Sequence, residues 1–433
     1  MIVEIIEKIR NSAIANRLSI AFLSKIYSII ISLISSVLIV RYLGPQRNGV
    51  YNYAIAYTTL FSGVATMGLD NVLIKEFSKE NSDQHSLFLA SIVVRFVASL
   101  LSLLALLASL WIFDIDKSQH IYILVASMPL LFNIFGAVSG WFYSAGKVKE
   151  VALVQSFTHT ICLMLRLVCA WKDYGVIVLL IIQGLETLFL LTVLWIMFFK
   201  TYKNRSSIKQ TIKKQIIFLI RQGIPICIGS VAYTVFMKMD QVMIREMIGE
   251  YDLGIYSCAV QIAELWYFIP NTIMLVLLPE LTKLYFDNNK KDFELLLQKS
   301  MSLFVLIGYG AAVVTMLGSK ILIRIMYGIE YIEAAPILCI YIWAGVFINM
   351  SVLRGGYFVI KEWTECSLIV NLTGAISNIV LNYILIKIMG QMGAAVSTLV
   401  SFAIYAYFSS FMIPKLRRIG IVQTKALLLR RLR

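Results

Sequence analysis

Long runs of hydrophobic residues separated by short polar segments dominate the chain. Each run approaches or exceeds the about 20 residues that a helix needs to cross about 30 Å of hydrocarbon. Alternating ten-residue segments, typical of a membrane β-barrel, do not occur. The pattern predicts an all-α polytopic membrane protein with about twelve spans, at residues 18–40, 49–69, 87–113, 119–141, 151–171, 174–199, 216–239, 253–278, 301–318, 335–352, 364–386 and 392–413.

The polar segments between the spans differ in their content of Lys and Arg. With the N-terminus placed in the cytoplasm, the cytoplasmic segments contain 27 Lys and Arg and the opposite loops contain 9. The positive-inside rule therefore predicts that both termini are cytoplasmic. This bias also accounts for most of the net charge of +15, so no nucleic acid or other acidic partner is needed to explain it.

Two stretches of the chain share one pattern. Residues 43–54 and residues 248–259 both read aliphatic-Gly-x4-Gly-[Val/Ile]-Tyr-x-x-Ala, 205 positions apart. Weaker matches follow before spans five and eleven and in the loops that close them. A motif that returns near half the chain length indicates a duplicated unit, and its glycines are expected to serve a tight turn and close packing.

The duplication predicts two lobes of six helices each. The boundary is placed in the basic segment between spans six and seven, which gives an N-terminal lobe at 1–207 and a C-terminal lobe with a basic cytoplasmic tail at 208–433. Six spans is an even number, so the two lobes share one orientation. They are expected to be related by a pseudo-twofold axis along the membrane normal.

Composition agrees with this class. The chain is 59% hydrophobic and 15% charged, whereas soluble domains are about a quarter charged. Residues 1–12 predict an interfacial amphipathic helix, and residues 290–297 predict a second surface helix. The Lys and Arg of the C-terminal tail are expected to touch anionic lipid.

Several spans carry polar residues on one helical face. One such face is usually helix-packing glue, but five together favour a hydrated interior surface. The five faces are Lys25, Ser28, Ser32 and Ser35; Ser91, Arg95, Ser99 and Ser102; Gln155, His159, Cys162 and Arg166; Ser230, Thr234, Lys238 and Gln241; and Ser367, Asn371, Gly374, Asn378 and Asn382.

The cations in these faces lie at different depths. Lys25 and Arg95 are about 10–12 Å from the cytoplasmic end of their spans. They are placed to meet an anionic head group from the inner leaflet, and the alternative is snorkelling to the interface. Arg166 and Lys238 lie nearer the periplasmic ends, where snorkelling is favoured.

Four carboxylates accompany these cations. Asp70 and Asp240 lie near span ends, where water can solvate them. Glu186 and Glu264 lie deep in their spans, where an ionised carboxylate is costly. They are therefore candidates for coupling transport to H+ or Na+, as is Asp240, and the alternative for the two glutamates is a partner cation on a neighbouring helix.

No catalytic constellation and no metal site is predicted. His159 and Cys162 share a face, but two ligands do not make a site. Residues 140–147 resemble a phosphate loop only superficially, with five residues between the glycines and Val148 where a magnesium-binding hydroxyl is required. Transport would not be powered by a nucleotide bound to this chain, and no cofactor is expected.

The motif residues themselves resemble a known family. Arg41-Tyr42-Leu43-Gly44-Pro45 followed by Gly49-Val50-Tyr51 is similar to the signature of Wzx-type O-antigen and polysaccharide flippases of the multidrug/oligosaccharidyl-lipid/polysaccharide exporter superfamily. Residues 240–256, 325–336 and 378–395 extend the resemblance over nearly the whole chain. The family typically has a basic residue in span one, and Lys25 occupies that place.

The resemblance implies an inner-membrane protein that moves undecaprenyl-diphosphate-linked oligosaccharide from the cytoplasmic to the periplasmic leaflet by alternating access. Lys25, Arg95, Arg166 and Lys238 would then meet the diphosphate or line the cavity. Ser28, Ser32, Asn371, Asn378 and Asn382 would face the sugars. Further candidate partners are the polymerase and other proteins of the same pathway.

Two other functions stay open from the sequence. A cation-coupled multidrug antiporter of the same superfamily needs an apolar cavity with essential acids, and Lys25 and Arg95 would repel its cationic drugs. A polytopic polymerase or ligase needs a sizeable outer loop with catalytic residues, and the outer loops here are short.

Overall fold

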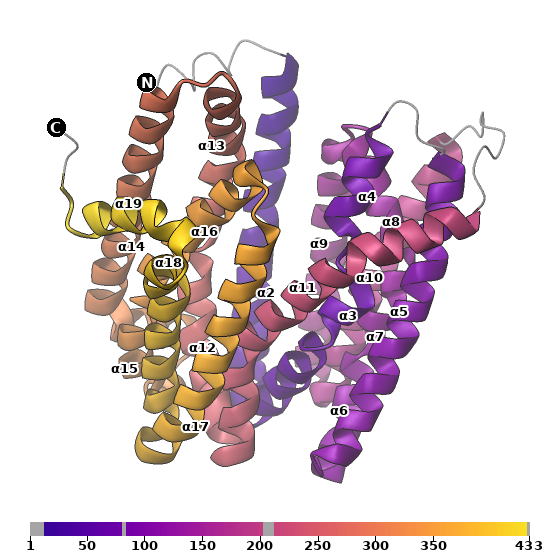
Figure 1. Ribbon diagram of the computed structural model, residues 1–433. Coiled ribbons are helices and arrows are strands. Elements are labelled where there is room, and N and C mark those ends of the chain that lie inside the picture. Colours follow the sequence, from indigo (N-terminus) through magenta and orange to yellow (C-terminus); the bar gives the residue numbers. More distant parts are fainter. Residues whose placement is uncertain (1–12, 80–83, 202–211, 431–433) are drawn as a thin grey trace. The chain divides into compact units, whose positions relative to one another are not determined.

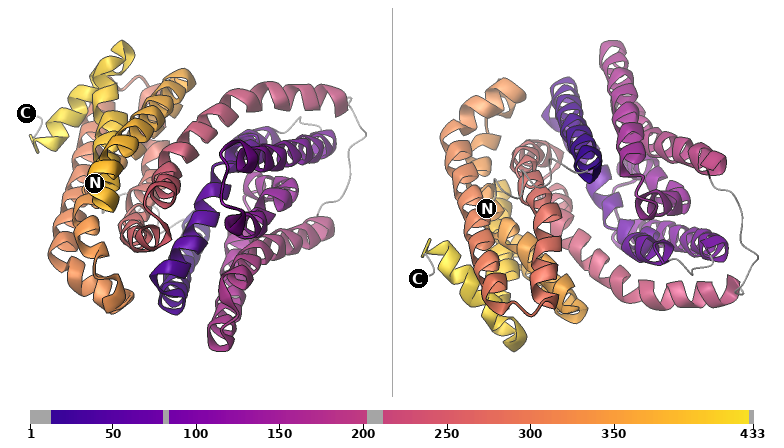
Figure 2. Two further views of the ribbon diagram at one scale, coloured as in Figure 1. Left: turned by 90° about the horizontal axis from the view of Figure 1, so that it is seen from below. Right: turned by 90° about the horizontal axis from the view of Figure 1, so that it is seen from above.

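The computed structural model describes residues 13–79, 84–201 and 212–430, and within them every regular element is a helix (Figure 1 and Figure 2). Ten helical segments of the described residues are long and apolar enough to cross a membrane. Two of these contain a glycine with non-helical backbone, Gly44 and Gly390, at the places where spans one and two and spans eleven and twelve meet. Counted on both sides of these breaks, the segments correspond to the twelve predicted spans.

The first half of the chain holds the helices up to the long helix α11. Their bounds are α2 Ala13–Thr59, α3 Ser62–Thr66, α4 Leu69–Phe77, α5 Gln84–Ile112, α6 Lys117–Ala126, α7 Met128–Phe132, η1 Asn133–Gly136, α8 Ala137–Ser144, α9 Val148–Lys172, α10 Gly175–Thr201 and α11 Ile212–Met247.

The second half ends in a short helix, α19. The bounds are α12 Glu250–Leu265, α13 Phe268–Phe286, α14 Lys290–Met326, η2 Ile329–Tyr331, α15 Ala334–Tyr341, α16 Ala344–Lys361, α17 Thr364–Ala403, η3 Ile404–Phe408, α18 Ser409–Met412, η4 Pro414–Leu416 and α19 Arg417–Leu427. Figure 1 shows α19 running crosswise beside α14 and α18, which it contacts.

Contacts divide the chain into two compact units that do not follow chain order. Unit 1 contains 1–43 and 57–231, and unit 2 contains 44–56 and 232–433. Residues 44–56 thus belong with the second unit, and the described start of α11 belongs with the first. For example, Leu219 of α11 is fully buried in the core of unit 1 with Leu69, Phe142 and Leu194. This division by contacts differs from the predicted division by chain order at 207/208.

Four glycines explain the tight turns between paired spans. Gly44 and Gly249 have φ of 68° and 137°, and Gly175 and Gly390 have φ of 80° and 59°. These are the glycines of the two repeated turns, and other residues rarely adopt such angles. The expectation that the repeat glycines serve tight turns is confirmed.

The two repeated motifs also pack against each other inside unit 2. A Cβ added to Gly49 would lie 1.8 Å from the carbonyl oxygen of Glu250, and one added to Gly254 would lie 1.9 Å from that of Pro45. The Asn48 side chain donates to the Gly254 carbonyl at 2.9 Å. The second glycine of each motif therefore permits a reciprocal backbone contact that a side chain would block.

Several predicted elements differ in their bounds. Residues 290–297 are the first turns of α14, which continues to Met326, so the separate surface helix predicted there was wrong. The segment 298–300 (Gln-Lys-Ser) contains no helix breaker, and Asn289 caps the helix by accepting from the Asp292 amide. The fourth, eighth and tenth predicted spans are interrupted at α6/α7, α12/α13 and α15/α16. The amphipathic helix predicted at 1–12 lies outside the described residues.

Candidate functional site: a polar track in unit 1

Polar side chains of α2 and α9 meet along the length of the two helices. The Ser28 and Ser156 hydroxyls are 3.3 Å apart, and the Tyr27 and Thr160 hydroxyls are 2.9 Å apart. Further along, Ser35 accepts from Arg166 Nη1 at 2.8 Å. We call the polar residues along this seam the polar track.

A charged cluster lies within the polar track, where α10 joins α2 and α9. One carboxylate oxygen of Glu186 accepts from Arg166 Nη2 at 2.6 Å. Its other oxygen contacts His159 Nδ1. A single carboxylate is thus shared by two basic side chains, one on each side, and Arg166 in turn holds Ser35.

The charged cluster is only partly covered by protein. The side chains of Arg166, Glu186 and His159 are 11%, 15% and 31% exposed. In a membrane-spanning helix such exposure means contact with either lipid or water, and ionised groups are strongly disfavoured in lipid. The cluster thus holds its charges against one another within the polar track, and the hydrated surface that the polar faces indicated stays a prediction.

Arg95 is the centre of a separate group of hydrogen bonds in unit 1. Its guanidinium is 1% exposed and donates to Asp70 at 2.5 Å and to the Asn133 amide oxygen at 2.8 Å. Gly136 makes room for it, because a Cβ there would lie 2.6 Å from Nη1. Asp70 is 64% exposed, as predicted, but Arg95 does not reach an open surface in this conformation.

The predicted residues of unit 2 are arranged differently. Lys238 and Glu264 form an ion pair at 3.5 Å, with side chains 24% and 31% exposed. Glu264 therefore has the partner cation that the sequence left open, as Glu186 does. Asp240 was expected to be solvated, and this was wrong: it is 2% exposed and accepts from Tyr256 at 2.6 Å and from the Gln241 amide at 2.8 Å. The packing of Tyr256 over it, sixteen residues away, could not be read from its place near a span end.

The predicted sugar-facing residues differ in exposure. Ser28 is buried and Ser32 is exposed, while Asn371 is half-buried. Asn378 and Asn382 are fully buried and bond to each other at 2.8 Å. The backbone of Lys25 lies in α2, but its side chain lies outside the described residues. Their roles toward a substrate stay predictions.

One buried cation was missed. Arg354 of α16 is 1% exposed and donates to the Ala406 carbonyl at 3.0 Å and to the Ser409 hydroxyl at 2.8 Å. Its guanidinium also lies 4.9 Å from the Tyr405 ring centroid. These partners come from the π-helix η3 and α18. The tenth span was predicted to end at 352, which placed Arg354 in a loop, whereas α16 continues to Lys361.

Comparison with known proteins decides the family. The sequence model of the family described as polysaccharide biosynthesis protein matches residues 14–285, more than half of the chain. The chain belongs to this family. A second model, described as MatE, matches residues 225–384. With ten helical segments among the described residues that are long and apolar enough to cross a membrane, this family member is a multi-pass membrane protein.

Known proteins that are similar to this chain match it over nearly its whole length. The capsular polysaccharide biosynthesis protein CapF of Staphylococcus aureus is 22% identical over 400 residues, covering 89% of this chain and 97% of CapF. Among solved structures, the lipid II flippase MurJ in an inward closed conformation matches with a TM-score of 0.73 at 18% identity, covering 94% of this chain and 91% of MurJ. An inward-facing multidrug resistance MATE transporter matches with a TM-score of 0.67 at 14% identity, covering 94% and 98%.

These likenesses show the fold. The predicted all-α, two-lobed architecture of the exporter superfamily is confirmed, and so is the predicted resemblance to a polysaccharide flippase family. The MatE match also shows why the antiporter alternative arose from the sequence: the two branches share the fold.

Proposed function

We propose that this protein is a flippase for undecaprenyl-diphosphate-linked oligosaccharide, an O-antigen or capsule repeat unit. It would act in the bacterial inner membrane, with both termini cytoplasmic. Substrate would pass from the cytoplasmic to the periplasmic leaflet by alternating access. Membership of the polysaccharide biosynthesis family and the likeness to CapF and to a lipid II flippase support this substrate class.

The polar track carries the proposal. Burying a sugar hydroxyl without a partner costs a few kcal/mol. The hydroxyls of Ser28, Ser156, Tyr27 and Thr160 exchange hydrogen bonds with one another, so they can exchange them with a sugar at little cost. A route of this kind lets the head group cross while the polyprenyl tail stays in the bilayer.

The charged cluster contains a cation that could bind the diphosphate, Arg166, and a carboxylate that competes for this cation, Glu186. Arg166 is matched to a diphosphate because its planar guanidinium forms paired hydrogen bonds to phosphate oxygens. In this conformation Glu186 occupies it. Uptake of a proton by Glu186 would neutralise the competing carboxylate and release Arg166 to the diphosphate. This step would couple transport to H+; Na+ binding at Glu186 would act in the same way.

The other predicted residues have places in this scheme. Lys25 and Arg95 would meet the diphosphate near the cytoplasmic leaflet, and Arg95 would first have to leave Asp70. Lys238 and Glu264 form the comparable pair in unit 2. Asp240 is a weaker coupling candidate, since Tyr256 and a backbone amide already satisfy it.

Transport of a fluorescent lipid-linked oligosaccharide by the full chain in proteoliposomes tests the proposal. We expect Arg166→Gln to lower the flipping rate at least about tenfold, because one charge-assisted hydrogen bond to phosphate is worth more than 1.4 kcal/mol. Lys25→Ala and Arg95→Ala should each impair flipping, and Lys25→Arg should be partly tolerated. Arg324→Ala, an exposed cation at the end of α14, is the matched control.

Three outcomes would contradict the proposal or a part of it. Wild-type protein that flips no lipid-linked oligosaccharide in either direction would remove the function. Full flipping by the Lys25→Ala/Arg95→Ala variant would remove the diphosphate role of those two cations, and flipping by Arg166→Gln at the wild-type rate would remove that of the cluster.

The second candidate is a cation-coupled multidrug antiporter, which the MatE match favours. The same proteoliposomes, loaded with a lipophilic cationic dye and given a pH or sodium gradient, distinguish the two. A flippase should leave the dye gradient unchanged. An antiporter should move the dye, and Glu186→Gln should abolish that movement.

A further inference from the structure

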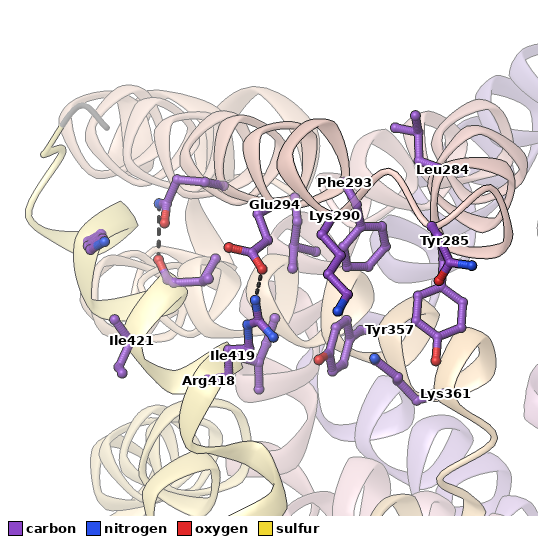
Figure 3. Close-up of a pocket in the computed structure, with 15 residues that line it drawn as sticks. Leu284, Tyr285, Lys290, Phe293, Glu294, Tyr357, Lys361, Arg418, Ile419 and Ile421 are labelled. Atoms are coloured by element: carbon purple, nitrogen blue, oxygen red, sulfur yellow. Dashed lines mark hydrogen bonds and ion pairs between the residues drawn. The ribbon is translucent and has the colours of Figure 1, made fainter. Parts of the chain in front are cut away.

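A pocket in unit 2 lies where four helices meet, at the end of α13, the start of α14, the end of α16 and along α19 (Figure 3). All residues that line the pocket belong to unit 2. They come from segments 279–300 and 414–433 and the end of span ten, which the charge bias assigns to the cytoplasmic face. The polar track lies in unit 1, so this pocket is a separate site.

The pocket is basic. Four cations line it, Lys290, Lys361, Arg418 and Lys425, against one carboxylate, Glu294. Glu294 is paired with Arg418, as the dashed line in Figure 3 shows. Within the described part of the chain the three lysines have no carboxylate partner. The lining therefore carries an excess of positive charge that nothing in the pocket neutralises.

One of these lysines, Lys361, lies close to two tyrosine rings. Lys361 Nζ lies 4.2 Å from the Tyr285 ring centroid and 5.7 Å from that of Tyr357. Figure 3 shows Lys290 and Lys361 both pointing toward Tyr357. Tyr357 is itself fixed, because it is 5% exposed and packs against the Trp363 ring at 5.8 Å. Aromatic faces attract a cation without neutralising it, so Lys361 is held in place with its charge available.

The helix that closes the pocket has the form of a membrane-surface helix. Ile419 and Ala426 of α19 are buried, while Ile421 at the pocket and Leu428 and Leu429 just after the helix are 50–58% exposed. Hydrogen bonds from Gln298 to the Val422 carbonyl at 3.1 Å and from Tyr309 to the Leu427 carbonyl at 3.2 Å hold it to α14. Exposed apolar side chains beside a basic pocket suit a molecule with a charged head and an apolar tail.

We propose that this pocket binds the phosphate head group of an anionic membrane lipid from the cytoplasmic leaflet. Lys290 and Lys361 hold the phosphate near Tyr357, and Lys425 adds to the positive electrostatic potential of the pocket. The acyl chains run along the exposed apolar edge of α19. Basic pockets between helices on the cytoplasmic side are suited to such head groups. The site does not depend on which substrate the polar track carries.

Lipid titration of the full-length chain in detergent, followed by native mass spectrometry, tests the proposal with phosphatidylglycerol as the probe. The Lys290→Gln/Lys361→Gln variant should bind phosphatidylglycerol about tenfold more weakly or worse, since each lysine near a lipid phosphate contributes to the attraction. Lys361→Arg should keep most of the affinity. The matched control is Lys387→Gln, because Lys387 also lies over a tyrosine ring, 3.8 Å from that of Tyr383, but outside the pocket.

Two further ligands, one lipid and one free anion, identify which part of phosphatidylglycerol the pocket recognises. Diacylglycerol, which has the tails but no phosphate, should not bind at the site. Inorganic phosphate should compete only weakly, because it lacks the tails. Thermal unfolding of each variant in the same detergent should match wild type, which would show that the two lysines are not needed for folding.

Three results would overturn the proposal. The first is equal phosphatidylglycerol affinity of wild type and the double variant. The second is binding of diacylglycerol as tight as that of phosphatidylglycerol. The third is inorganic phosphate binding as tightly as the lipid, which would make the pocket a site for a free anion. None of these results bears on flipping, so the two proposals fail independently.

Discussion

Each unit buries one arginine to the same degree and stabilises it in a different way. Arg95 in unit 1 and Arg354 in unit 2 are both 1% exposed, and both leave Nε without a partner. Arg95 faces a carboxylate, Asp70, that is itself 64% exposed. Arg354 faces a backbone carbonyl, two serine hydroxyls and two aromatic rings.

The difference concerns how readily each charge can be released. Asp70 is exposed, so salt or a competing anion can loosen its hold on Arg95. The partners of Arg354 are uncharged groups, and one of them is the Ala406 carbonyl in the π-helix. That carbonyl also accepts from Gln423 of α19 at 2.9 Å. Unit 1 therefore keeps an arginine that can change partners, and unit 2 keeps one that ties α16, η3 and α19 together.

Arg354→Ala should have the largest effect. It leaves a cavity and removes the donor from the Ser409 and Ser410 hydroxyls and from one side of the Ala406 carbonyl, so we expect a loss of about 4 kcal/mol in unfolding free energy. Arg354→Lys should not restore it, because an ammonium lacks the planar fork that reaches these acceptors. Thermal and denaturant unfolding in detergent measure both, with Arg324→Ala as the exposed control. A variant as stable as wild type would show that Arg354 does not hold α16, η3 and α19 together.

Arg95→Met should cost about 2 kcal/mol. Removing one partner of a fully buried pair costs about 3–5 kcal/mol, but water solvates the Asp70 that remains, which lowers the cost. Adding Asp70→Asn to Arg95→Met should change stability little further, whereas Asp70→Asn alone leaves Arg95 buried with only Asn133 as a partner. A double-mutant cycle on unfolding free energy measures the coupling. Additive effects of the two substitutions would show that Arg95 and Asp70 do not stabilise each other.

Ser35→Ala should have the smallest effect, about 1 kcal/mol, because it removes one acceptor from Arg166 and leaves Glu186 in place. Ser32→Ala is the matched control on the same helix, since Ser32 is exposed, and it should not change unfolding. A loss with Ser32→Ala as large as with Ser35→Ala would show that the two serines act through helix α2 as a whole and not through the charged cluster.

The fold could largely be predicted because apolar run length determines which segments span a membrane. The repeat added more, since Gly44 and Gly249 occupy turns whose φ other residues rarely adopt. Breaks inside spans were missed because α6 and α7, or α15 and α16, stay apolar across the break. Hydropathy does not change where a membrane helix bends, so it gives no signal for the bend.

The site could be predicted only as helix faces. Periodicity grouped Ser28 with Ser35 and His159 with Arg166 on single faces, but which faces meet is a property of packing between helices. The sequence accordingly left Glu186 open between a free acid and a paired one, and the contact with Arg166 on α9 decided it. Arg354 was missed for a simpler reason: the predicted span ended two residues before it, at 352, which turned a buried cation into a loop residue, whereas α16 continues to Lys361.

The exchange of segments between the units has a consequence for synthesis of the chain. Residues 44–56 are made early but find their packing partners, among them Glu250 and Gly254, only about two hundred residues later. Unit 1 likewise stays incomplete until Leu219 of α11 has been translated. Unit 1 therefore cannot complete its packing until part of α11 has been made, and residues 44–56 must wait for the second half of the chain.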